Sequence, residues 1–396
     1  MKKILFVINT LNGGGAEKVL VDLLNNLDKK YYVIDLFLFD KQGIYLKSLS
    51  REIRVLSSYT NKNKWMECIA AHVLCRINNR FTRKLFLRYN KDFTHEFIKR
   101  ANAEELYKCF IGNRKYDIEV AFLEGIATKL IAGSKRKGAK KIAWVHTDLV
   151  KHGWFKRYFI SEQEIQECYN KFDEVVCVSE EIKNVFEATY RKKATVKWNP
   201  IDSKLIKSKS WEETDLLLDR KSFYYVAVGR FTKEKGFERL LNVHVRLIEE
   251  GYNVQLWIIG NGELFKSIAG VIKNENLNNS VKLLGFQENP YKYMKNADLY
   301  VCSSYVEGLS TTVLEALILG VPVVTTDCPG MNGLLENSKY GFITENSEQG
   351  LYNGIKIMLD DKKLYLQYRE YAKIRGRQFD ITKSMADIEE LFEGKN

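Results

Sequence analysis

The sequence has little proline and no paired cysteine motif, and both shortages exclude classes of protein. Only 4 prolines and 25 glycines occur among 396 residues, so the chain is neither collagen-like nor of low complexity. The 7 cysteines form no Cys-x-x-Cys pair, and no Cys/His spacing supplies a tetrahedral zinc set. An odd number of cysteines without an export signal is typical of a reduced protein, and we expect a cytoplasmic location.

Long apolar runs are absent as well. No stretch approaches about 18 consecutive apolar residues, so we expect no transmembrane helix. The apolar run at residues 4–8 follows Met1-Lys2-Lys3, but it is short and lacks a small-residue cleavage site. We interpret it as a buried first strand rather than a signal peptide. Hydrophobic residues at 45% and charged residues at 28% are typical of a soluble globular protein.

The net charge of +12 is distributed unevenly along the chain. Residues 1–200 hold 37 Lys and Arg against 23 Asp and Glu, whereas residues 201–396 hold 25 against 27. The excess of positive charge therefore belongs to the first half. Such an asymmetry indicates an anionic partner, such as a membrane surface or a nucleic acid.

Short apolar strands alternate with helices of about 10–15 residues through the second half, which predicts right-handed crossovers and a parallel sheet. The expected strands there are 223–229, 254–260, 281–284, 298–303 and 321–326. The first half begins with the same alternation. Its expected strands are 3–8, 32–39, 118–123, 142–145 and 175–178. A basic helical segment at about 60–115 interrupts it.

This pattern predicts an α/β protein with two Rossmann-like, doubly wound domains that face a cleft. We expect the first domain to span residues 1–198, with the basic helical insert at about 60–115. The second domain is expected at 199–370. The tail, 371–396, is expected to form a helix that returns to the first domain.

Ligands of open α/β sheets bind beyond the carboxyl ends of the strands, so the residues after each strand are the candidates. Gly14 and Gly15 follow the first strand and begin a helix, where backbone N–H groups can meet an anion. His146 follows a later strand and could hydrogen-bond a sugar or a phosphate. The alternatives are a tight turn for the glycines and a satisfied loop residue for the histidine.

The second half offers two positive charges in one loop. Arg230 and Lys235 flank the start of the helix after the strand at 223–229. Guanidinium and ammonium groups stabilise the charge of a leaving diphosphate, although both could also be solvated cations. Gly260 and Gly262 follow the next strand and would let a ligand approach the backbone, unless they form a simple turn.

The strongest signal is a pair of glutamates around the start of a helix. Glu307 precedes the helix and Glu315 lies on its second turn among apolar residues, so its carboxylate needs a partner. The hydroxyls of a ribose would serve. The residues between them would present N–H groups at the helix start. These are Gly308, Leu309 and Ser310.

Six motifs together resemble the GT-B fold retaining glycosyltransferases of family 4, the glycosyl transferases group 1, and in particular members from capsular and lipopolysaccharide biosynthesis. The motifs are GGGAEK at 13–18, VHTD at 145–148, NPID at 199–202, VGRFTKEKGFERLL at 228–241, IIGNGE at 258–263 and EGLSTTVLEALILGVPVVTTDCPG at 307–330. Their order and spacing match across nearly the whole chain. Residues 60–115 are the segment least covered.

The resemblance implies a role for each candidate. Arg230 and Lys235 would bind the donor diphosphate, Glu315 the ribose and Glu307 the donor sugar. The backbone of Gly308, Leu309 and Ser310 would assist, and His146 would lie near the reactive face of the sugar. The turn at Gly14 and Gly15 would approach the phosphate, Gly260 and Gly262 would line the donor site, and Gly285 and Phe286 would lie near the base.

The resemblance also implies a reaction that retains anomeric configuration. No carboxylate pair is placed for a double displacement, and no Asp-x-Asp motif occurs, so neither a metal nor another cofactor is expected. Cationic side chains and helix dipoles would replace the metal. One departure is Gly333, where relatives often carry an acidic residue.

The basic segment at 76–100 has the pattern of a helix on an anionic membrane surface. Its cations are Arg76, Arg80, Arg83, Lys84, Arg88, Lys91, Lys99 and Arg100, with phenylalanines and leucines between them. The alternative is a core-packing helix with a solvated basic face. No nucleic-acid motif is present, so we expect no nucleic-acid partner.

These observations predict a metal-independent glycosyltransferase that moves a sugar from a nucleotide sugar, with UDP as the expected nucleotide, to a hydroxyl of a lipid-linked or oligosaccharide acceptor. The pathway would build a bacterial surface polysaccharide, with the protein peripheral on the inner face of the cell membrane. Two alternatives stay open. One is a phosphorylase or sugar-phosphate synthase of the same fold, and the other is a non-catalytic partner subunit that supports the membrane association of another transferase.

Overall fold

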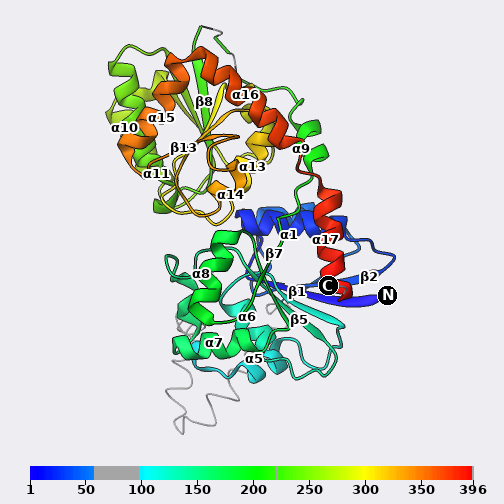
Figure 1. Ribbon diagram of the computed structural model, residues 1–396. Coiled ribbons are helices and arrows are strands. Elements are labelled where there is room, and N and C mark those ends of the chain that lie inside the picture. The colour runs from blue at the N-terminus through cyan, green and yellow to red at the C-terminus, as the bar shows by residue number, and fades with distance from the viewer. Residues whose placement is uncertain (58–97, 217, 220, 395–396) are drawn as a thin grey trace. The chain divides into compact units, whose positions relative to one another are not determined.

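The computed structural model describes residues 1–57, 98–216, 218–219 and 221–394. The chain divides into two compact units (Figure 1). Unit 1 comprises residues 1–199 and 384–396, and unit 2 comprises residues 200–383. Most of the basic segment predicted at 76–100, and the part of the insert from 60 to 97, lie outside the described residues.

Unit 1 is built on a seven-stranded parallel sheet of order β3-β2-β1-β4-β5-β6-β7. The strands are β1 (Lys2–Ile8), β2 (Tyr32–Leu38), β3 (Arg54–Ser57), β4 (Ile118–Ala121), β5 (Lys140–Val145), β6 (Glu174–Cys177) and β7 (Thr195–Val196). Residues 4–8 are fully buried, as expected for a central parallel strand covered on both faces. The interpretation of this run as a first strand is confirmed.

Helices connect the strands of unit 1. They are α1 (Gly15–Asn26), η1 (Ile44–Ser48), α5 (Ala103–Phe110), α6 (Ile126–Ala132), η3 (Trp154–Tyr158), α7 (Glu162–Asn170) and α8 (Glu180–Tyr190). Ser161 and Ser179 cap α7 and α8 by accepting hydrogen bonds from Glu164 N–H (3.1 Å) and Ile182 N–H (3.2 Å). Acidic residues in the first turns of both helices complement the helix dipole.

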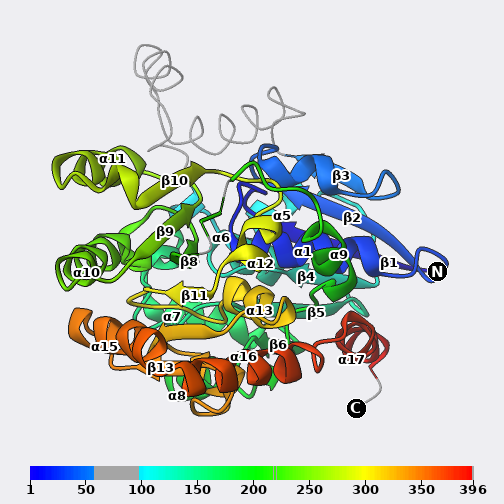
Figure 2. The ribbon, with the colours of Figure 1, turned by 90° about the horizontal axis from the view of Figure 1, so that it is seen from above.

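Unit 2 is built on a six-stranded sheet of order β10-β9-β8-β11-β12-β13, again with every pair parallel. Its strands are β8 (Phe223–Val228), β9 (Val254–Ile259), β10 (Val281–Gly285), β11 (Leu299–Cys302), β12 (Val323–Thr326) and β13 (Phe342–Thr344). Figure 2 shows this order across the sheet. The predicted α/β class with parallel sheets is confirmed in both units.

The helices of unit 2 follow the strands. They are α9 (Ser203–Lys209), η4 (Lys233–Lys235), α10 (Phe237–Glu249), α11 (Phe265–Asn274), η5 (Leu277–Asn279), α12 (Tyr291–Asn296), α13 (Thr311–Ile318), α14 (Met331–Leu335), α15 (Glu348–Asp360) and α16 (Lys362–Gly376). The strand order reverses at β8, which lies between β9 and β11. The loops after β8 and β11 therefore meet at a topological switch point.

The C-terminal helix α17 (Ile381–Glu393) lies against the strands of unit 1. The ring centroids of Phe392 and Phe6 are 6.1 Å apart, and Lys140 Nζ donates to Leu391 O at 2.6 Å. The prediction that this segment begins at residue 371 is wrong, because residues 371–383 belong to unit 2. A Cβ at Gly376 of α16 would lie only 2.0 Å from Leu317 O, so α16 approaches α13 closely and stays with unit 2.

Candidate active site

The loops after β8 and β11 are joined by backbone and side-chain hydrogen bonds. Ser303 Oγ donates to Lys235 O at 2.8 Å, and Tyr305 N–H donates to Glu234 O at 2.7 Å. These bonds place the predicted basic loop against the loop that carries Glu307. The switch point of the sheet therefore brings together residues 68 and 71 positions apart in the sequence.

Lys235 and Glu307 form an ion pair at this point. Lys235 Nζ lies 2.6 Å from Glu307 Oε1, and the two side chains are 25% and 11% exposed. Ser304 Oγ donates to the same carboxylate oxygen. Burial lowers the pKa of the Lys235 ammonium, but the charge and hydrogen bond of Glu307, together with the nearby Cys302, outweigh burial and the net pKa is raised. Lys235 is therefore held in its charged form and in one orientation.

Two glycines next to this loop have close neighbours. A Cβ at Gly229 would lie 3.3 Å from the Cδ of Lys235. Gly236 has φ +62° and caps the start of α10, and a Cβ there would lie 2.2 Å from Ser303 O. Arg230 is exposed in the same loop, and among the described residues it forms no ion pair. Its positive charge is close enough to lower the pKa of Lys235, although the net pKa remains raised.

The start of α13 carries the second predicted glutamate. Ser310 caps the helix by accepting a hydrogen bond from Val313 N–H at 3.4 Å. Glu315 is 3% exposed, and the hydroxyl of Tyr291 donates to its Oε1 at 3.2 Å. The Tyr291 hydroxyl thus supplies Glu315 with the hydrogen-bond donor that we expected the hydroxyls of a ribose to supply. Gly308 lies against Gly330, because a Cβ at Gly330 would lie 2.0 Å from Gly308 O.

Gly260 and Gly262 have a packing reason for being glycine. A Cβ at Gly260, where φ is +141°, would lie 1.9 Å from Gly229 O, and a Cβ at Gly262 would lie 2.6 Å from Phe231 O. The loop after β9 therefore lies on the loop after β8. These glycines hold the basic loop in place, whether or not a ligand also approaches them.

Gly285 and Phe286 have more open surroundings than Gly260 and Gly262, which lie against neighbouring backbone. Gly285 ends β10 at φ +64°, and no atom lies within 4 Å of a Cβ built there. Phe286 is 40% exposed. An exposed aromatic ring next to an open backbone position can stack on a planar ligand group.

The candidates of unit 1 lie at the carboxyl ends of β1 and β5. Gly14 is the N-cap of α1 and Gly15 its first residue. His146 is 7% exposed, its ring lies 4.9 Å from that of Phe122, and its Nε2 has no hydrogen-bond partner among the described residues. Burial lowers the pKa of His146 to about 4. The imidazole is therefore neutral at pH 7 and can offer a hydrogen bond but no charge.

Sequence reasoning missed Glu124, which holds the His146 loop. Its side chain is fully buried, and its Oε1 accepts hydrogen bonds from the backbone N–H groups of His146 and Thr147, the latter at 2.8 Å. Burial raises the pKa of this carboxyl. Glu124 follows β4, so the rule of examining the residues after each strand could have found it.

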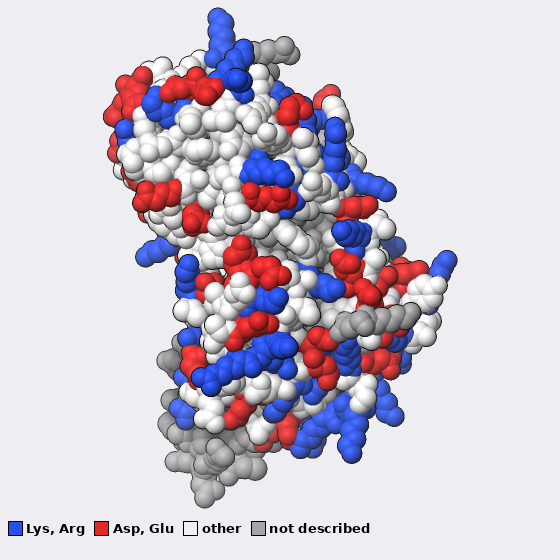
Figure 3. Space-filling model, viewed as in Figure 1, with Lys and Arg blue, Asp and Glu red and all other residues white. Residues whose placement is uncertain are grey.

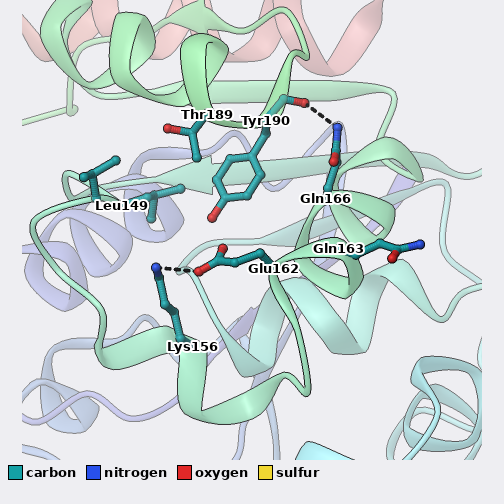
Figure 4. Close-up of a pocket in the computed structure, with 8 residues that line it drawn as sticks. Leu149, Lys156, Glu162, Gln163, Gln166, Thr189 and Tyr190 are labelled. Carbon is teal, nitrogen blue, oxygen red and sulfur yellow. Dashed lines mark hydrogen bonds and ion pairs between the residues drawn. The ribbon is translucent and has the colours of Figure 1, made fainter.

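A cavity of about 330 Å³ lies elsewhere in unit 1, between η3, α7 and α8 (Figure 4). Figure 4 shows the ring of Tyr190 in its centre, with Lys156 and Glu162 paired at one side. None of the predicted site residues lines it.

Two further searches concern metals and membranes. In the described ranges, no group of three or more His, Cys, Asp and Glu side chains could hold a metal ion. No helix in that part of the chain is long and apolar enough to cross a bilayer.

The chain is similar in sequence to known proteins over part of its length. Residues 210–375 match the family model described as glycosyl transferases group 1. The N-acetylgalactosamine-N,N'-diacetylbacillosaminyl-diphospho-undecaprenol 4-alpha-N-acetylgalactosaminyltransferase of Campylobacter jejuni is 34% identical over 198 residues, 50% of this chain and 52% of that protein. The UDP-Gal:alpha-D-GlcNAc-diphosphoundecaprenol alpha-1,3-galactosyltransferase of Escherichia coli is 28% identical over 46% of this chain and 48% of that protein. The chain therefore spans about half the length of these curated relatives.

Solved structures extend the similarity to the whole fold. The structure of HepE from Anabaena in complex with UDP and glucose superposes with a TM-score of 0.71 at 18% identity, and all of both chains is covered. At that identity the likeness concerns the fold alone. Residues 210–375 thus match the glycosyl transferases group 1 model, and the chain that contains them has the GT-B fold.

Proposed function

We propose that this protein is a retaining glycosyltransferase that transfers a sugar from a nucleotide sugar, with UDP as the favoured nucleotide, to a hydroxyl of a lipid-linked or oligosaccharide acceptor. The product would be part of a bacterial surface polysaccharide. One observation carries the proposal: Lys235 and Glu307 are paired at 2.6 Å at the switch point of a group 1 domain. The names of the Campylobacter and Escherichia relatives support the choice of a lipid-linked acceptor.

The chemistry follows from where charge develops. As the bond between the anomeric carbon and the phosphate oxygen breaks, negative charge grows on the diphosphate, and the ammonium of Lys235 and the guanidinium of Arg230 would stabilise it. The acceptor hydroxyl forms the new bond to the anomeric carbon on the same face. Its proton passes to the departing phosphate oxygen. Two cationic side chains supply the charge that a metal ion would otherwise supply, so the proposal needs no metal.

Other residues would bind and orient the donor. Glu307 would contact the sugar hydroxyls while it orients Lys235, and the backbone at the start of α13 would meet the phosphate or sugar. Glu315, next to Tyr291, would bind the ribose hydroxyls. His146 enters the proposal as a neutral hydrogen-bonding group for the sugar.

A nucleotide screen tests the proposal directly. The melting temperature of the purified protein would be measured with UDP-, GDP-, ADP- and TDP-sugars in metal-free buffer, together with slow hydrolysis of each donor. Ligand at about 100 times its Kd adds about 2.7 kcal/mol to the free energy of unfolding, so one nucleotide should raise the melting temperature clearly. If none does so while the protein is folded, the enzyme proposal fails and the non-catalytic partner subunit is favoured.

Membrane association completes the proposal. Within unit 1, the loop 149–160 exposes Val150 and Ile160, which are 65% and 68% exposed, and it contains no acidic residue. It also carries the exposed cations Lys151 and Arg157, while the exposed Lys156 is paired with Glu162. Apolar side chains beside cations fit an anionic lipid surface. Figure 3 shows groups of basic side chains, interspersed with acidic ones, over unit 1 on the face drawn.

Vesicle sedimentation tests this part. We expect binding to vesicles with anionic lipid at low salt, little binding to zwitterionic vesicles, and weaker binding of the double variant Val150→Ser, Ile160→Ser. The control is the double variant Leu366→Ser, Ile374→Ser, whose side chains are 46% and 45% exposed in unit 2. If the unmodified protein does not bind the anionic vesicles, the membrane proposal is overturned. If both double variants bind equally well, the loop 149–160 is not part of the membrane-binding surface.

A further inference from the structure

Arg239 is a buried cation that the proposed function does not use. It lies in the first turn of α10 and is 3% exposed. Among the described residues it forms no ion pair. Burial lowers the pKa of the guanidinium, although arginine remains charged in proteins. A cation at the positive end of a helix dipole, without a carboxylate partner, is locally unfavourable.

The guanidinium binds the backbone of one loop through two of its nitrogens and the side chain of Asn346 through the third. Its Nε donates to Ser303 O at 2.8 Å and its Nη2 to Ser304 O at 2.7 Å, while the ring of Tyr305 lies 3.8 Å from Cζ. Its Nη1 donates to Asn346 Oδ1 at 2.9 Å, and Asn346 Nδ2 donates in turn to Tyr305 O at 2.8 Å. Three consecutive carbonyl groups, 303 to 305, are therefore held by Arg239 and Asn346.

Side chains of this loop donate hydrogen bonds to both residues of the ion pair in the candidate site. Ser304 Oγ donates to the carboxylate of Glu307, and Ser303 Oγ donates to the backbone oxygen of Lys235. Gly236, the neighbour of Lys235, lies against Arg239, since a Cβ there would be 2.9 Å from its Nε. A shift of the 303–305 backbone would therefore move both members of the pair.

The hydrogen bonds of Arg239 satisfy the carbonyl groups of Ser303 and Ser304, so the side chain also contributes to the stability of unit 2. Residues that break local rules concentrate at functional sites. We propose that Arg239 is a positioning residue of the donor site, which fixes the 303–305 backbone so that Ser304 and Glu307 hold Lys235 toward the diphosphate. This inference rests on the proposed function and extends it to a residue outside the ion pair.

A double-mutant cycle tests the proposal. Arg239→Lys keeps the charge but loses the planar fork, so kcat/KM for donor turnover should fall about 10–100-fold. If Arg239 acts through Glu307, the same substitution should cost less than about threefold in the Glu307→Gln background. A purely structural role would make the two losses multiply. Asn346→Ala, which removes one acceptor of Arg239 and one donor to Tyr305, should show the same coupling and serves if Arg239→Lys does not fold.

The matched control is Arg375→Lys. Arg375 is 9% exposed and also donates to two backbone carbonyls, Leu334 O at 2.9 Å and Gly333 O at 3.1 Å. We expect it to lower the melting temperature as Arg239→Lys does, with kcat/KM changed less than about twofold. Multiplicative losses in the cycle, or an equal kinetic effect of the control, would overturn the role of Arg239. No donor turnover by the unmodified protein would instead overturn the proposed function, and this inference with it.

Discussion

Replacing Lys235 with alanine is expected to lower kcat/KM for the nucleotide-sugar donor by about 10²–10³-fold, the loss typical of removing one preorganised group from a developing anion. The ammonium is held at 2.6 Å from Glu307 Oε1 and is three-quarters buried, so its charge acts with little screening by water. The measurement is release of nucleotide from whichever donor stabilises the protein, at several donor concentrations, so that kcat and KM are separated. An effect on kcat would identify a group that acts mainly in the transition state.

The neighbouring Lys233→Ala variant is the matched control. Lys233 is exposed in the same short helix η4, and its removal should change kcat/KM by less than about twofold. Lys235→Arg retains the charge and separates charge from geometry. Full turnover by a folded Lys235→Ala protein would contradict the mechanism.

Gly260→Ala is expected to destabilise unit 2 by roughly 3 kcal/mol or more, the largest stability effect of any glycine substitution considered. The backbone at φ +141° suits only glycine, and the added Cβ would lie 1.9 Å from the carbonyl oxygen of Gly229. Neither atom is the end of a flexible side chain, so backbone must move. The measurement is the free energy of unfolding in urea.

Alanine substitutions at two other glycines separate the effect of the backbone conformation from the effect of packing. Gly285→Ala has a positive φ of +64° but open space around the Cβ, so it should cost only about 1–2 kcal/mol. Gly270→Ala lies within α11 with nothing within 4 Å, so it should be neutral or stabilising by up to about 1 kcal/mol. Equal losses of unfolding free energy at Gly260 and Gly285 would show that the positive φ alone causes the destabilisation, without a contribution from the contact of the added Cβ. The packing of the β8 and β9 loops would then need another explanation.

Local patterns predicted the central strands well and the edges poorly. Residues 4–8 and 223–228 are apolar runs long enough to identify, and both form central strands. The edge strands β3, β7 and β13 have only 4, 2 and 3 residues and were not predicted, whereas the edge strand β10, with 5 residues, was expected at 281–284. Such short segments have no periodicity of their own, and pairing with a neighbouring strand decides their conformation.

The C-terminal helices show the same limit. The tail at 371–396 is expected to form one helix, but it is divided between α16 and α17, which pack on different units. Gly376 keeps α16 close to Leu317 in unit 2, whereas Phe392 meets Phe6 in unit 1. A hydrophobic face shows that a helix must be covered, and only the tertiary structure shows what covers it.

The candidate site, too, was predicted only in part from the sequence. Residue types and spacing were enough to single out Lys235 and Glu307, because cations and carboxylates beside glycine at the ends of strands are locally conspicuous. The sequence by itself therefore determined the alternation of strands and helices, the α/β class and the group of chemically capable residues. Only the tertiary structure decided that Lys235 meets Glu307, that Tyr291 meets Glu315 and that Arg239 is buried against the 303–305 backbone. These contacts join residues 24 to 72 positions apart, and such pairings depend on strand order in the sheet, which no local pattern encodes.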